Sequence, residues 1–339
     1  MDDPAFSRVR KRVSACRVVV TGAAGFIGSA VCRALLDAGC HVTGIDSFDP
    51  FYARRVKEGR LVMLRRWARF TFREADVRTT PLMEKVLARA DVLVHLAARA
   101  GVRASVAEPG PYIALNVRGT AAVLEAARRA GVRRVVFASS SSVYGDAAAP
   151  FVEASTALRP RSPYGATKRA GELLCRAYAD QHGFRVAVLR LFSVYGPGQR
   201  PDQAVHRFAH RLVSGRPIER YGDGPLERDY THVDDVVNGV MRAVGWTETG
   251  GARCEICNIG TGRAVTIDRL IQLIADSLGV APVVVMAPAH DGDAARTLAD
   301  LNKARTVLGY CPTVAVETGV PEFIQWFEVA YGRQSRAAS

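Results

Sequence analysis

CRVVVTGAAGFIGSAVCRALLDAGCHVTGIDS, residues 16–47, is the stretch that decides the fold. Its opening run RVVV is short, β-branched and bounded by glycine, which is typical of a buried parallel strand. Three glycines then open a segment whose apolar positions follow the helical period, and Gly39 ends that segment. HVTGID follows as a second strand, with Asp46 at its end. The stretch therefore predicts a strand–helix–strand unit.

Each of the three glycines has a physical role in such a unit. One allows a tight turn, one lets the backbone approach a pyrophosphate closely, and one lets the helix pack closely on the strand. The phosphates of a dinucleotide then lie over the free N–H groups at the helix N-terminus. Asp46 can accept hydrogen bonds from a ribose diol and would repel a 2′-phosphate, which favours NAD over NADP. The predicted NAD-binding residues of this stretch are Gly22, Ala24, Gly25, Phe26, Ile27, Gly28 and Asp46.

Composition and charge narrow the class of protein. The chain has 339 residues, of which 48% are hydrophobic and 23% are charged, as in an ordinary globular enzyme. Its net charge of +13 comes from arginines scattered over presumed helix faces, which argues against nucleic-acid binding and fits a polyanionic small substrate. No apolar run has the length of a membrane span, and the N-terminus lacks the apolar core of a signal peptide. We therefore expect a cytoplasmic enzyme without a membrane partner.

The cysteines also favour a cytoplasmic location. Seven of them are spread along the chain, as expected of reduced thiols. Cys254 and Cys257 form a CxxC pattern, but no second pair with the spacing of zinc ligands follows. The surrounding CEICNIG, residues 254–260, alternates small and apolar residues as a short strand does. We therefore predict a strand there and no metal site.

The glycine spacing and three later motifs together point to a family. The pattern TGAAGFIGS at 21–29 is GxxGxxG rather than GxGxxG. HLAA at 95–98, SPYGATK at 162–168 and RDYTHVDD at 228–235 follow it. This combination resembles the extended short-chain dehydrogenase/reductases, the nucleotide-sugar epimerases and dehydratases. The resemblance implies further NAD contacts, and these are Asp76, Val77, Leu96, Ala97, Ala98 and Asn116.

Tyr164 and Lys168 are the predicted catalytic pair. Four residues apart on a helix, they lie on one face about 6 Å apart along its axis. A free tyrosine has a pKa of about 10, and we expect the lysine ammonium and the charged nicotinamide to lower it toward the working range. The resemblance implies that Lys168 also holds the nicotinamide ribose and that Ser140 is the catalytic serine. In the implied cycle Tyr164 takes a proton from a sugar hydroxyl while hydride passes to NAD+, and the hydride returns to the opposite face.

The segment FASSSSVYGD at 137–146 discriminates between branches of the family. The 4,6-dehydratases carry Asp-Glu just before VYG, and the UDP-glucuronate decarboxylases carry Glu. This chain has Ser141 and Ser142 there. Elimination lacks its acid catalyst, so 4-epimerisation is favoured.

Other segments resemble the UDP-glucuronate 4-epimerases. The segment at 47–64 is similar to theirs, and Ser193 stands where UDP-glucose 4-epimerases have Asn. A guanidinium at Arg200 suits a carboxylate, whereas a neutral hydroxymethyl group would leave it unpaired. Gln203 stands where Met is usual, and its side chain is expected to face solvent. Oxidation of glucuronate at carbon 4 gives a β-keto acid that tends to lose carbon dioxide, so we hypothesise a clamp on the carboxylate, made by Ser141, Ser142, Ser193 and Arg200.

The nucleotide is expected to lie against later segments. The resemblance implies that Tyr221 packs on the uracil and that Arg228 contacts the diphosphate. Arg228 could instead be an ion-pair partner of Asp229 or Asp234. The predicted substrate-binding residues outside the clamp are Tyr221, Arg228, Arg296 and Arg103.

The element pattern predicts the domain organisation. Short strands alternate with amphipathic helices up to about Leu191, which predicts an α/β fold with a doubly wound parallel (Rossmann) sheet and a smaller, discontinuous C-terminal substrate domain. The active site is expected in the cleft outside the carboxyl ends of the strands. The predicted boundaries are 15–192 plus 231–260 for the NAD-binding domain, 193–230 plus 261–328 for the nucleotide-sugar domain, and 1–14 and 329–339 for terminal extensions, the first of them ragged.

The function that follows is NAD-dependent 4-epimerisation of UDP-glucuronate to UDP-galacturonate. A UDP-glucose or UDP-N-acetylglucosamine 4-epimerase is the main alternative. A UDP-glucuronate decarboxylase or 4,6-dehydratase would need an acid near Ser142, and a non-catalytic NAD-sensing protein would not need Tyr164 and Lys168. The helices expected at 163–182 and near 112–130 resemble the four-helix dimer interface of the family, which implies a homodimer.

Overall fold

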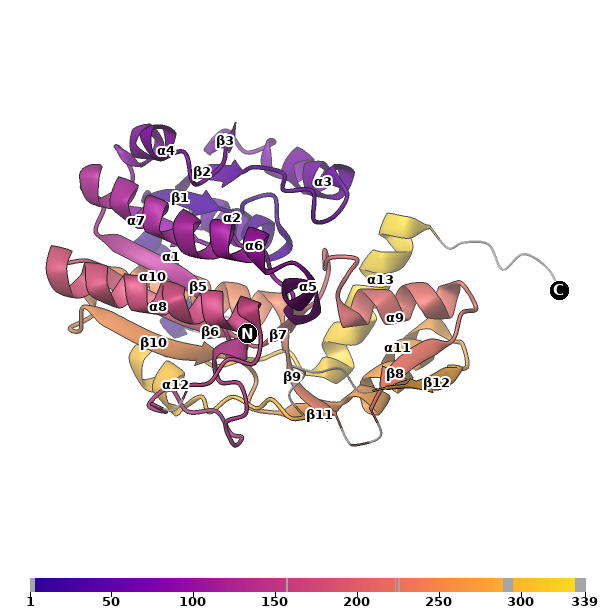
Figure 1. Cartoon of the computed structure of the whole chain (residues 1–339). Coiled ribbons are helices and arrows are strands. Elements are labelled where there is room, and N and C mark those ends of the chain that lie inside the picture. Colours follow the sequence, from indigo (N-terminus) through magenta and orange to yellow (C-terminus); the bar gives the residue numbers. More distant parts are fainter. Residues whose placement is uncertain (1–3, 157, 223, 225, 289–294, 333–339) are drawn as a thin grey trace.

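A computed structural model gives the fold of residues 4–156, 158–222, 224, 226–288 and 295–332. Within this described part, seven parallel strands form one sheet, here called the large sheet, in the order β10-β6-β5-β4-β1-β2-β3 (Figure 1). The doubly wound parallel sheet predicted from the sequence is confirmed. The strands are β1 (Arg17–Thr21), β2 (His41–Asp46), β3 (Phe70–Glu74), β4 (Val92–His95), β5 (Arg134–Ser140), β6 (Arg185–Leu191) and β10 (Cys254–Ile259).

The quoted stretch forms the centre of this sheet. Strand β1 leads through the glycines into helix α2 (Phe26–Asp37), and the chain returns as β2 beside β1. On its other side β1 pairs with β4, so the order of the strands reverses at β1. A reversal of this kind opens a crevice at the carboxyl ends of the strands, where ligands of such sheets bind.

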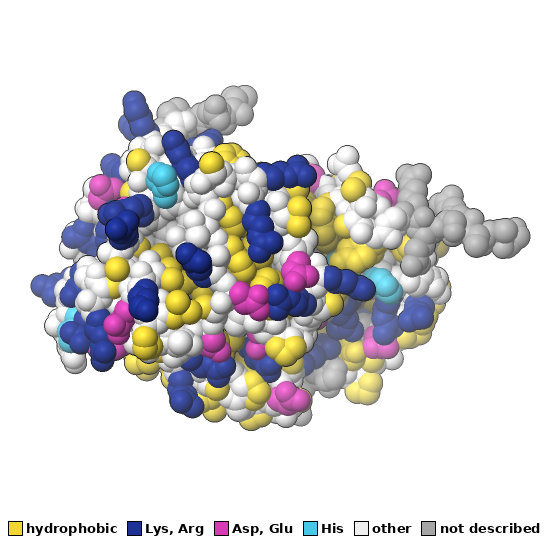
Figure 2. Space-filling model, turned by 90° about the horizontal axis from the view of Figure 1, so that it is seen from above, with side chains coloured by type: hydrophobic (Ala, Val, Ile, Leu, Met, Phe, Trp, Pro, Cys, Tyr) yellow, Lys and Arg dark blue, Asp and Glu magenta, His cyan; other side chains and the backbone are white. Residues whose placement is uncertain are grey.

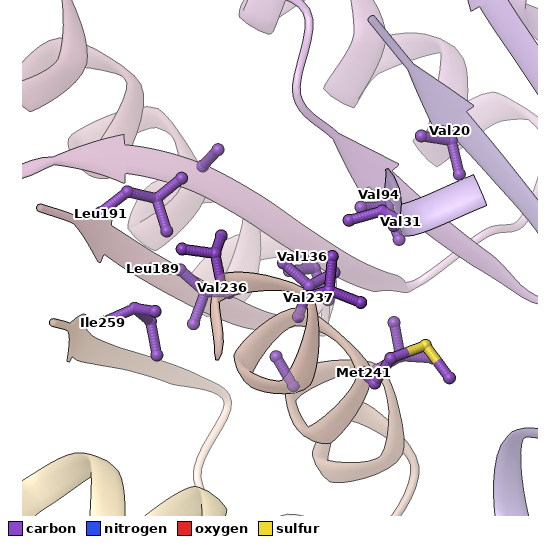
Figure 3. Close-up of a cluster of buried hydrophobic side chains, with 14 of the residues drawn as sticks. Val20, Val31, Val94, Val136, Leu189, Leu191, Val236, Val237, Met241 and Ile259 are labelled. Carbon is purple, nitrogen blue, oxygen red and sulfur yellow. The ribbon is translucent and has the colours of Figure 1, made fainter. Parts of the chain in front are cut away.

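Helices cover both faces of the large sheet. On one face α2 packs beside α10 (Val233–Thr249), and Figure 3 shows Val236, Val237 and Met241 of α10 against Val136 and Leu189 of the sheet. The other face carries α4 (Thr80–Leu87), α7 (Gly119–Arg129) and α8 (Pro163–His182). Burial on both faces explains why the strands read as continuous apolar runs rather than as alternating ones.

Helix α8 has the boundaries that its sequence predicts. The Ser162 side chain caps its first turn by accepting a hydrogen bond from the Gly165 N–H at 3.1 Å, and Pro163 occupies the first helical position. Gly183 ends it in the left-handed region, with a φ of 67°. The cap and the stop fix which face of α8, and therefore which side chains, meet the sheet.

The rest of the described chain forms two small sheets and a third apolar core. One sheet has the order β11-β9-β7, and the other is the parallel pair β12-β8. Helices α9, α11 and α13 pack around the third core. The elements are β7 (Ser193–Tyr195), α9 (Ala204–Val213), β8 (Ile218–Tyr221), β9 (Glu227–His232), β11 (Ala264–Thr266), α11 (Ile267–Leu278), β12 (Val284–Ala287) and α13 (Val316–Tyr331).

The chain passes repeatedly between the large sheet and the small sheets. It leaves the large sheet between β6 and β7, and it returns where β9 runs directly into α10. It leaves again between β10 and β11, returns for α12 (Asn302–Leu308), which packs on α10 and β10, and ends in α13. The two parts are therefore joined by several covalent connections.

The N-terminal segment differs from the ragged extension expected for residues 1–14. Residues 4–13 form helix α1 (Pro4–Val13), which packs on α10. Val13 is fully buried, and Arg12 donates a hydrogen bond to the Thr249 hydroxyl at 3.1 Å. The apolar side of this helix packs against the core. Sequence reasoning missed this because it tested the segment only for the apolar core of a signal peptide. At the other end α13 continues to Tyr331, and residues 333–339 of the second expected extension lie outside the described residues.

The surface agrees with the expected scatter of basic side chains. On the face in Figure 2, lysines and arginines lie singly or in small groups, with acidic side chains between them. Within the described part of the chain, no helix combines the length and the apolar character that crossing a membrane requires.

Candidate active site

The glycine loop, residues 22–28, has the tight geometry predicted for it. Gly22 has a φ of +74°, and a Cβ on it would lie 2.9 Å from the Ala97 nitrogen. A Cβ on Gly28 would overlap the Gly22 carbonyl oxygen. Helix α2 begins at Phe26, directly after Gly25, so its first N–H groups face the carboxyl end of β1. A Cβ therefore fits at neither Gly22 nor Gly28, and the first N–H groups of α2 are the main-chain donors left at this turn among the described residues.

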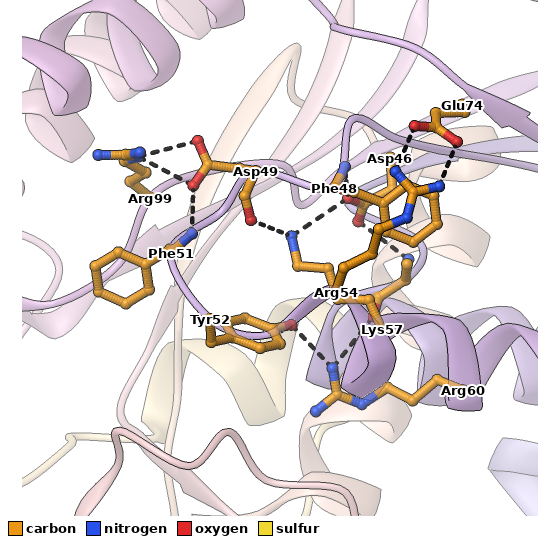
Figure 4. Close-up of polar contacts among 11 residues, drawn as sticks. Asp46, Phe48, Asp49, Phe51, Tyr52, Arg54, Lys57, Arg60, Glu74 and Arg99 are labelled. Carbon is orange, nitrogen blue, oxygen red and sulfur yellow. Dashed lines mark hydrogen bonds and ion pairs between the residues drawn. The ribbon is translucent and has the colours of Figure 1, made fainter.

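Asp46 lies at the end of β2 beside this loop. Its carboxylate accepts hydrogen bonds from the N–H groups of Ala24 at 3.1 Å and Phe48 at 2.9 Å. The ammonium of Lys57, on α3 (Arg54–Leu64), lies 3.5 Å from the same carboxylate (Figure 4). Sequence reasoning found Asp46 but missed Lys57, because a lysine on an exposed-looking helix carries no spacing signal.

The other predicted cofactor residues fall into two groups. Val77, Leu96, Ala97 and Ala98 line the same cavity as Gly25, Phe26, Ile27, Gly28 and Asp46, whereas Gly22, Ala24, Asp76 and Asn116 support its walls. The Asp76 carboxylate is engaged by the Arg78 guanidinium, whose hydrogen bonds hold the pKa of Asp76 below its ordinary value.

Asn116 lies in a π-helical segment, η1 (Ile113–Arg118), between α6 (Pro109–Tyr112) and α7. Its side-chain amide donates to the Thr167 hydroxyl at 3.0 Å and to the Arg99 carbonyl at 2.9 Å, and its carbonyl accepts from the Arg99 N–H. It thus ties the segment after β4 to helix α8. Wide turns of this kind often occur at functional sites.

Tyr164 and Lys168 lie on the first turns of α8 and line the cavity together with Ser140, the last residue of β5. The Lys168 ammonium donates to the Ala138 carbonyl at 2.7 Å. Burial lowers the pKa of Lys168 to about 8. Burial also raises the pKa of Tyr164, opposed by the Ser140 hydroxyl and the Arg200 charge. The protein alone therefore does not lower the tyrosine pKa as expected, because desolvation exceeds these opposing effects.

The four residues of the hypothesised clamp lie at different depths. Ser193 and Arg200 line the cavity, whereas Ser141 and Ser142 lie just behind it on the turn η2 (Ser141–Val143). The Ser142 hydroxyl is 3.1 Å from the Ser140 hydroxyl, so it reaches the cavity through that serine. Ser140 and Ser142 thus form a pair of hydrogen-bonded hydroxyls at the end of β5.

The Arg200 guanidinium is almost buried, with 14% of its side chain exposed. Its Nε and Nη2 donate to the Asp202 carboxylate, and Nη2 also donates to the Ala100 carbonyl at 3.1 Å. Its guanidinium carbon lies 5.2 Å from the centre of the Phe51 ring. One edge of the guanidinium is therefore held by the protein, and Nη1 forms no hydrogen bond with any residue that the structure describes.

Gln203 corrects one expectation. Its side chain lines the cavity instead of facing solvent, and its Oε1 is buried without a hydrogen-bond partner among the described residues. It precedes α9, and the turn of the chain there points it inward. A single polar residue before a helix gives no sign of its direction in the sequence.

The predicted nucleotide residues are only partly brought together. Tyr221 and Arg228 line the cavity, and the Arg103 guanidinium carbon lies 4.2 Å from the centre of the Tyr221 ring. Arg228 donates to the main-chain carbonyls of Glu227 and Ala295, and within the described residues it pairs with neither Asp229 nor Asp234. Arg296 lies outside the cavity wall and pairs with Glu227 at 2.8 Å.

The cavity has a volume of about 670 Å³ and runs from the glycine loop to β8 and α11. This is the range of a site that holds a cofactor or a sizeable small molecule. Four further cationic side chains, which sequence reasoning did not single out, also line this cavity. They are Lys57, Arg99, Arg207 and Arg220.

Comparison with known proteins agrees with this geometry. Residues 18–260 match the NAD dependent epimerase/dehydratase family. The chain is 34% identical over 335 residues to the probable UDP-glucuronate 4-epimerase of Rhizobium meliloti, covering 94% of this chain and 98% of that protein.

Solved structures extend the comparison to three dimensions. The UDP-glucuronic acid 4-epimerase from Bacillus cereus, solved with UDP-glucuronic acid and NAD, is 36% identical with a TM-score of 0.88, over 93% of this chain and 100% of that one. DesIV, a dTDP-glucose 4,6-dehydratase from Streptomyces venezuelae solved with NAD and TYD bound, is 33% identical with a TM-score of 0.86, over 93% of this chain and 98% of that one. Likeness over nearly the whole length, in sequence and in fold, means that the chain belongs to the NAD dependent epimerase/dehydratase family.

Proposed function

We propose that this chain is an NAD-dependent UDP-sugar 4-epimerase that converts UDP-glucuronate to UDP-galacturonate. One observation carries the choice of substrate. The Arg200 guanidinium reaches the same cavity as Tyr164 and is close enough for its charge to oppose the rise in the tyrosine pKa. A cation beside the reacting hydroxyl suits a sugar that carries a carboxylate.

The residues at the other end of the cavity fit NAD. The glycine loop leaves no room for a Cβ at Gly22 or Gly28, and Asp46 with Lys57 lies where the ribose of the adenosine would lie. When bound, NAD supplies the hydride acceptor and a positive charge near Tyr164. The protein residues bind it, orient it and exclude water.

Tyr164 is proposed to accept the proton of the sugar 4-hydroxyl. Ser140 lies at the same wall of the cavity and is proposed to hold the reacting oxygen by a hydrogen bond. Lys168, anchored to the Ala138 carbonyl, places an ammonium one helical turn from the phenol and favours its ionised form. Lys168 is also proposed to hold the nicotinamide ribose, and all three residues lie on α8 or at the end of β5.

The clamp remains a proposal for keeping the carboxylate of the keto intermediate in place. The Nη1 edge of Arg200 and the Ser193 hydroxyl would hold it directly, Ser142 would support it through Ser140, and Ser141 would act from the same turn. A β-keto acid loses carbon dioxide fastest when the bond to the carboxylate is perpendicular to the ketone plane. A fixed carboxylate in another orientation slows this loss.

Tyr221, Arg103, Arg228 and Arg207 are proposed to bind the nucleotide. The first three come from the sequence, and Arg207 is added because it lines the cavity and forms no side-chain hydrogen bond or ion pair among the described residues. Arg296 keeps a weaker place in the proposal, since its guanidinium is held by Glu227 outside the wall.

The domain division and the assembly are also proposals. The covalent crossings of the chain support separate NAD-binding (15–192 plus 231–260) and nucleotide-sugar (193–230 plus 261–328) domains. Exposed apolar side chains on α8 and η1, Leu173 at 55% and Ile113 at 51%, support a homodimer through these helices. The seven free thiols, all in described residues, support a cytoplasmic location.

A product assay tests the function. The purified protein is incubated with UDP-glucuronate, UDP-glucose or UDP-N-acetylglucosamine without added NAD, and the products are identified by NMR. We expect UDP-galacturonate from the first substrate, and a loss of about 10²- to 10⁴-fold for Tyr164→Phe. Conversion of a neutral sugar alone would assign the chain to the alternative epimerases, and a 4-keto-6-deoxy sugar would assign it to the dehydratases.

The clamp has its own test. Arg200→Ala is expected to give UDP-pentose beside the epimer, because the keto acid is then free to align for loss of carbon dioxide. Ser142→Ala is expected to give less UDP-pentose, since Ser142 acts through Ser140. Unchanged epimerisation without UDP-pentose in both variants would refute the clamp.

A further inference from the structure

Arg60 on helix α3 joins three segments that are distant in the sequence. Its guanidinium donates to the Ala24 carbonyl at 3.2 Å, to the Tyr52 hydroxyl at 2.9 Å and to the Gly198 carbonyl at 2.6 Å. Figure 4 shows the Arg60 side chain reaching from α3 to the Tyr52 hydroxyl. Arg60 itself is not among the residues that line the cavity.

Two of the three acceptors belong to neighbouring loops with different proposed roles. Ala24 lies in the glycine loop, which is proposed to bind NAD. Gly198 lies in the loop 196–200, which ends at Arg200. The two loops lie close together, since a Cβ added to Gly198 would lie 3.7 Å from the Phe26 ring.

The loop 196–200 depends on side-chain hydrogen bonds to hold its conformation, because its backbone is irregular. Gly196 and Gly198 have φ values of +130° and +86°, which lie outside the regular conformations of strands and helices. Gln199 braces the loop from its other side, donating to the Val194 carbonyl at 3.1 Å. Arg60 is the support that connects this loop to the cofactor end.

The third acceptor, Tyr52, links Arg60 to Arg200 directly. Its hydroxyl accepts from Arg60, while its ring lies under the Arg200 guanidinium, 5.9 Å from the ring centre to the guanidinium carbon. The neighbouring Phe51 ring lies at 5.2 Å on the same guanidinium. The position of Arg200 therefore depends on Arg60 through both the loop and the Tyr52 ring.

We propose that Arg60 is a positioning residue that fixes the Arg200 guanidinium relative to the glycine loop. Through these contacts it sets the position of the sugar carboxylate relative to the cofactor, although it contacts neither. The identity of the ligand at Arg200 rests on the proposed function. A misplacement of about 1 Å at a reacting centre can cost about 10²-fold in rate, so such a tie matters for catalysis.

The experiment compares Arg60→Met, which keeps the aliphatic stem and removes the donors, with Arg66→Met. Arg66 is exposed just beyond the end of α3 and forms no side-chain hydrogen bond or ion pair in the described part of the chain. Three quantities are measured: the rate at which the purified protein loses bound NAD during dilution, the KM for UDP-glucuronate, and the fraction of product released as UDP-pentose.

We expect Arg60→Met to lose NAD about tenfold faster, to raise the KM for UDP-glucuronate about tenfold with a smaller change in kcat, and to release UDP-pentose. Arg66→Met is expected to behave as the wild type. A purely structural role of Arg60 would lower kcat and the fraction of folded enzyme without UDP-pentose. That outcome overturns the proposal. A wild-type rate of NAD loss, a wild-type KM or the absence of UDP-pentose in Arg60→Met also overturns it.

Tyr52→Phe is a second variant that tests the same proposal if Arg60→Met does not fold. It removes only the hydroxyl that accepts from Arg60 and keeps the ring under Arg200, so we expect the same changes at about threefold. No change in NAD loss and no UDP-pentose in Tyr52→Phe and Arg60→Lys would overturn the proposal. The NAD measurement needs no sugar. If the wild type does not convert UDP-glucuronate, the proposed function fails while the tie from Arg60 to the glycine loop is still tested.

Discussion

The large sheet and the small sheets form opposite ends of one cavity but are built differently. Strands β4, β5 and β6 are buried along almost their whole length. On β12, by contrast, Val284 and Met286 are 40% and 56% exposed. The strands below the glycine loop therefore lie in a dense core, whereas the edge strand β12 is open to solvent, although β7 and β9 are largely buried. The two ends should respond differently to substitution.

The groups that line the cavity also differ between its two ends. At the cofactor end the cavity is shaped by main-chain groups of the glycine loop, where a single Cβ does not fit. At the nucleotide end it is shaped by long cationic side chains such as Arg103, Arg207 and Arg228. Main-chain donors are fixed before a ligand arrives, whereas each arginine loses side-chain entropy on binding.

The largest expected contrast is between two glycine-to-alanine substitutions. Gly28→Ala would force a Cβ into the Gly22 carbonyl, so we expect purification without NAD and a clear loss of thermal stability. Gly59→Ala, in the exposed interior of α3, meets nothing within 4 Å and is expected to stabilise by about 0.5–1 kcal/mol. NAD content by absorbance after denaturation and thermal unfolding measure both. Normal NAD content in Gly28→Ala would show that the loop is less tightly built than its geometry indicates.

A matched pair of valines tests the difference in packing. Val188 on β6 is fully buried, and Val284 on β12 is 40% exposed. Val188→Ala is expected to lower the free energy of unfolding by about 2–3 kcal/mol, whereas Val284→Ala should change it by less than about 0.5 kcal/mol. Urea unfolding of the two variants gives the values. Equal losses would break the contrast between the sheets.

The smallest effect concerns the buried charge at Lys168. Its folded pKa of about 8 lies below the ordinary value of 10.5 because of burial. Below about pH 8 both states carry the proton, and between the two values the unfolded state binds more protons, so stability rises with pH in that window. Between about pH 7 and about pH 9.5 the wild type should gain about 2 kcal/mol relative to Lys168→Met. A difference that stays constant across these pH values would contradict the lowered pKa.

The sequence predicted the strand, turn and helix of the glycine loop correctly because local rules govern them. The strand, the turn of Gly22 and the helix after Gly25 are fixed by residues within a few positions of one another, and Tyr164 and Lys168 share a helix. The fold class and the strand at Cys254–Ile259 were confirmed for the same reason.

The sugar-nucleotide end was less predictable because its side chains meet across long stretches of sequence. Nothing near Arg60 indicates a contact with Gly198, and nothing near Gln203 indicates that it faces inward. Arg296 was selected by resemblance, yet the local partner Glu227 holds it outside the wall. Burial raises the pKa of Tyr164 in the protein alone, and this effect could not be predicted because burial is a property of the folded chain and not of a four-residue spacing.

The repeated crossings of the chain between the large and small sheets have a mechanical consequence. A body joined to another by one linker can swing widely, but several covalent connections allow only small relative displacements without bond rotation at every crossing. UDP-sugar must nevertheless enter and leave the cavity. We therefore expect its exchange to be gated by local motions of side chains such as Arg103 over Tyr221, on the fast timescales of rotamer and loop changes, and not by a slow opening of the whole molecule.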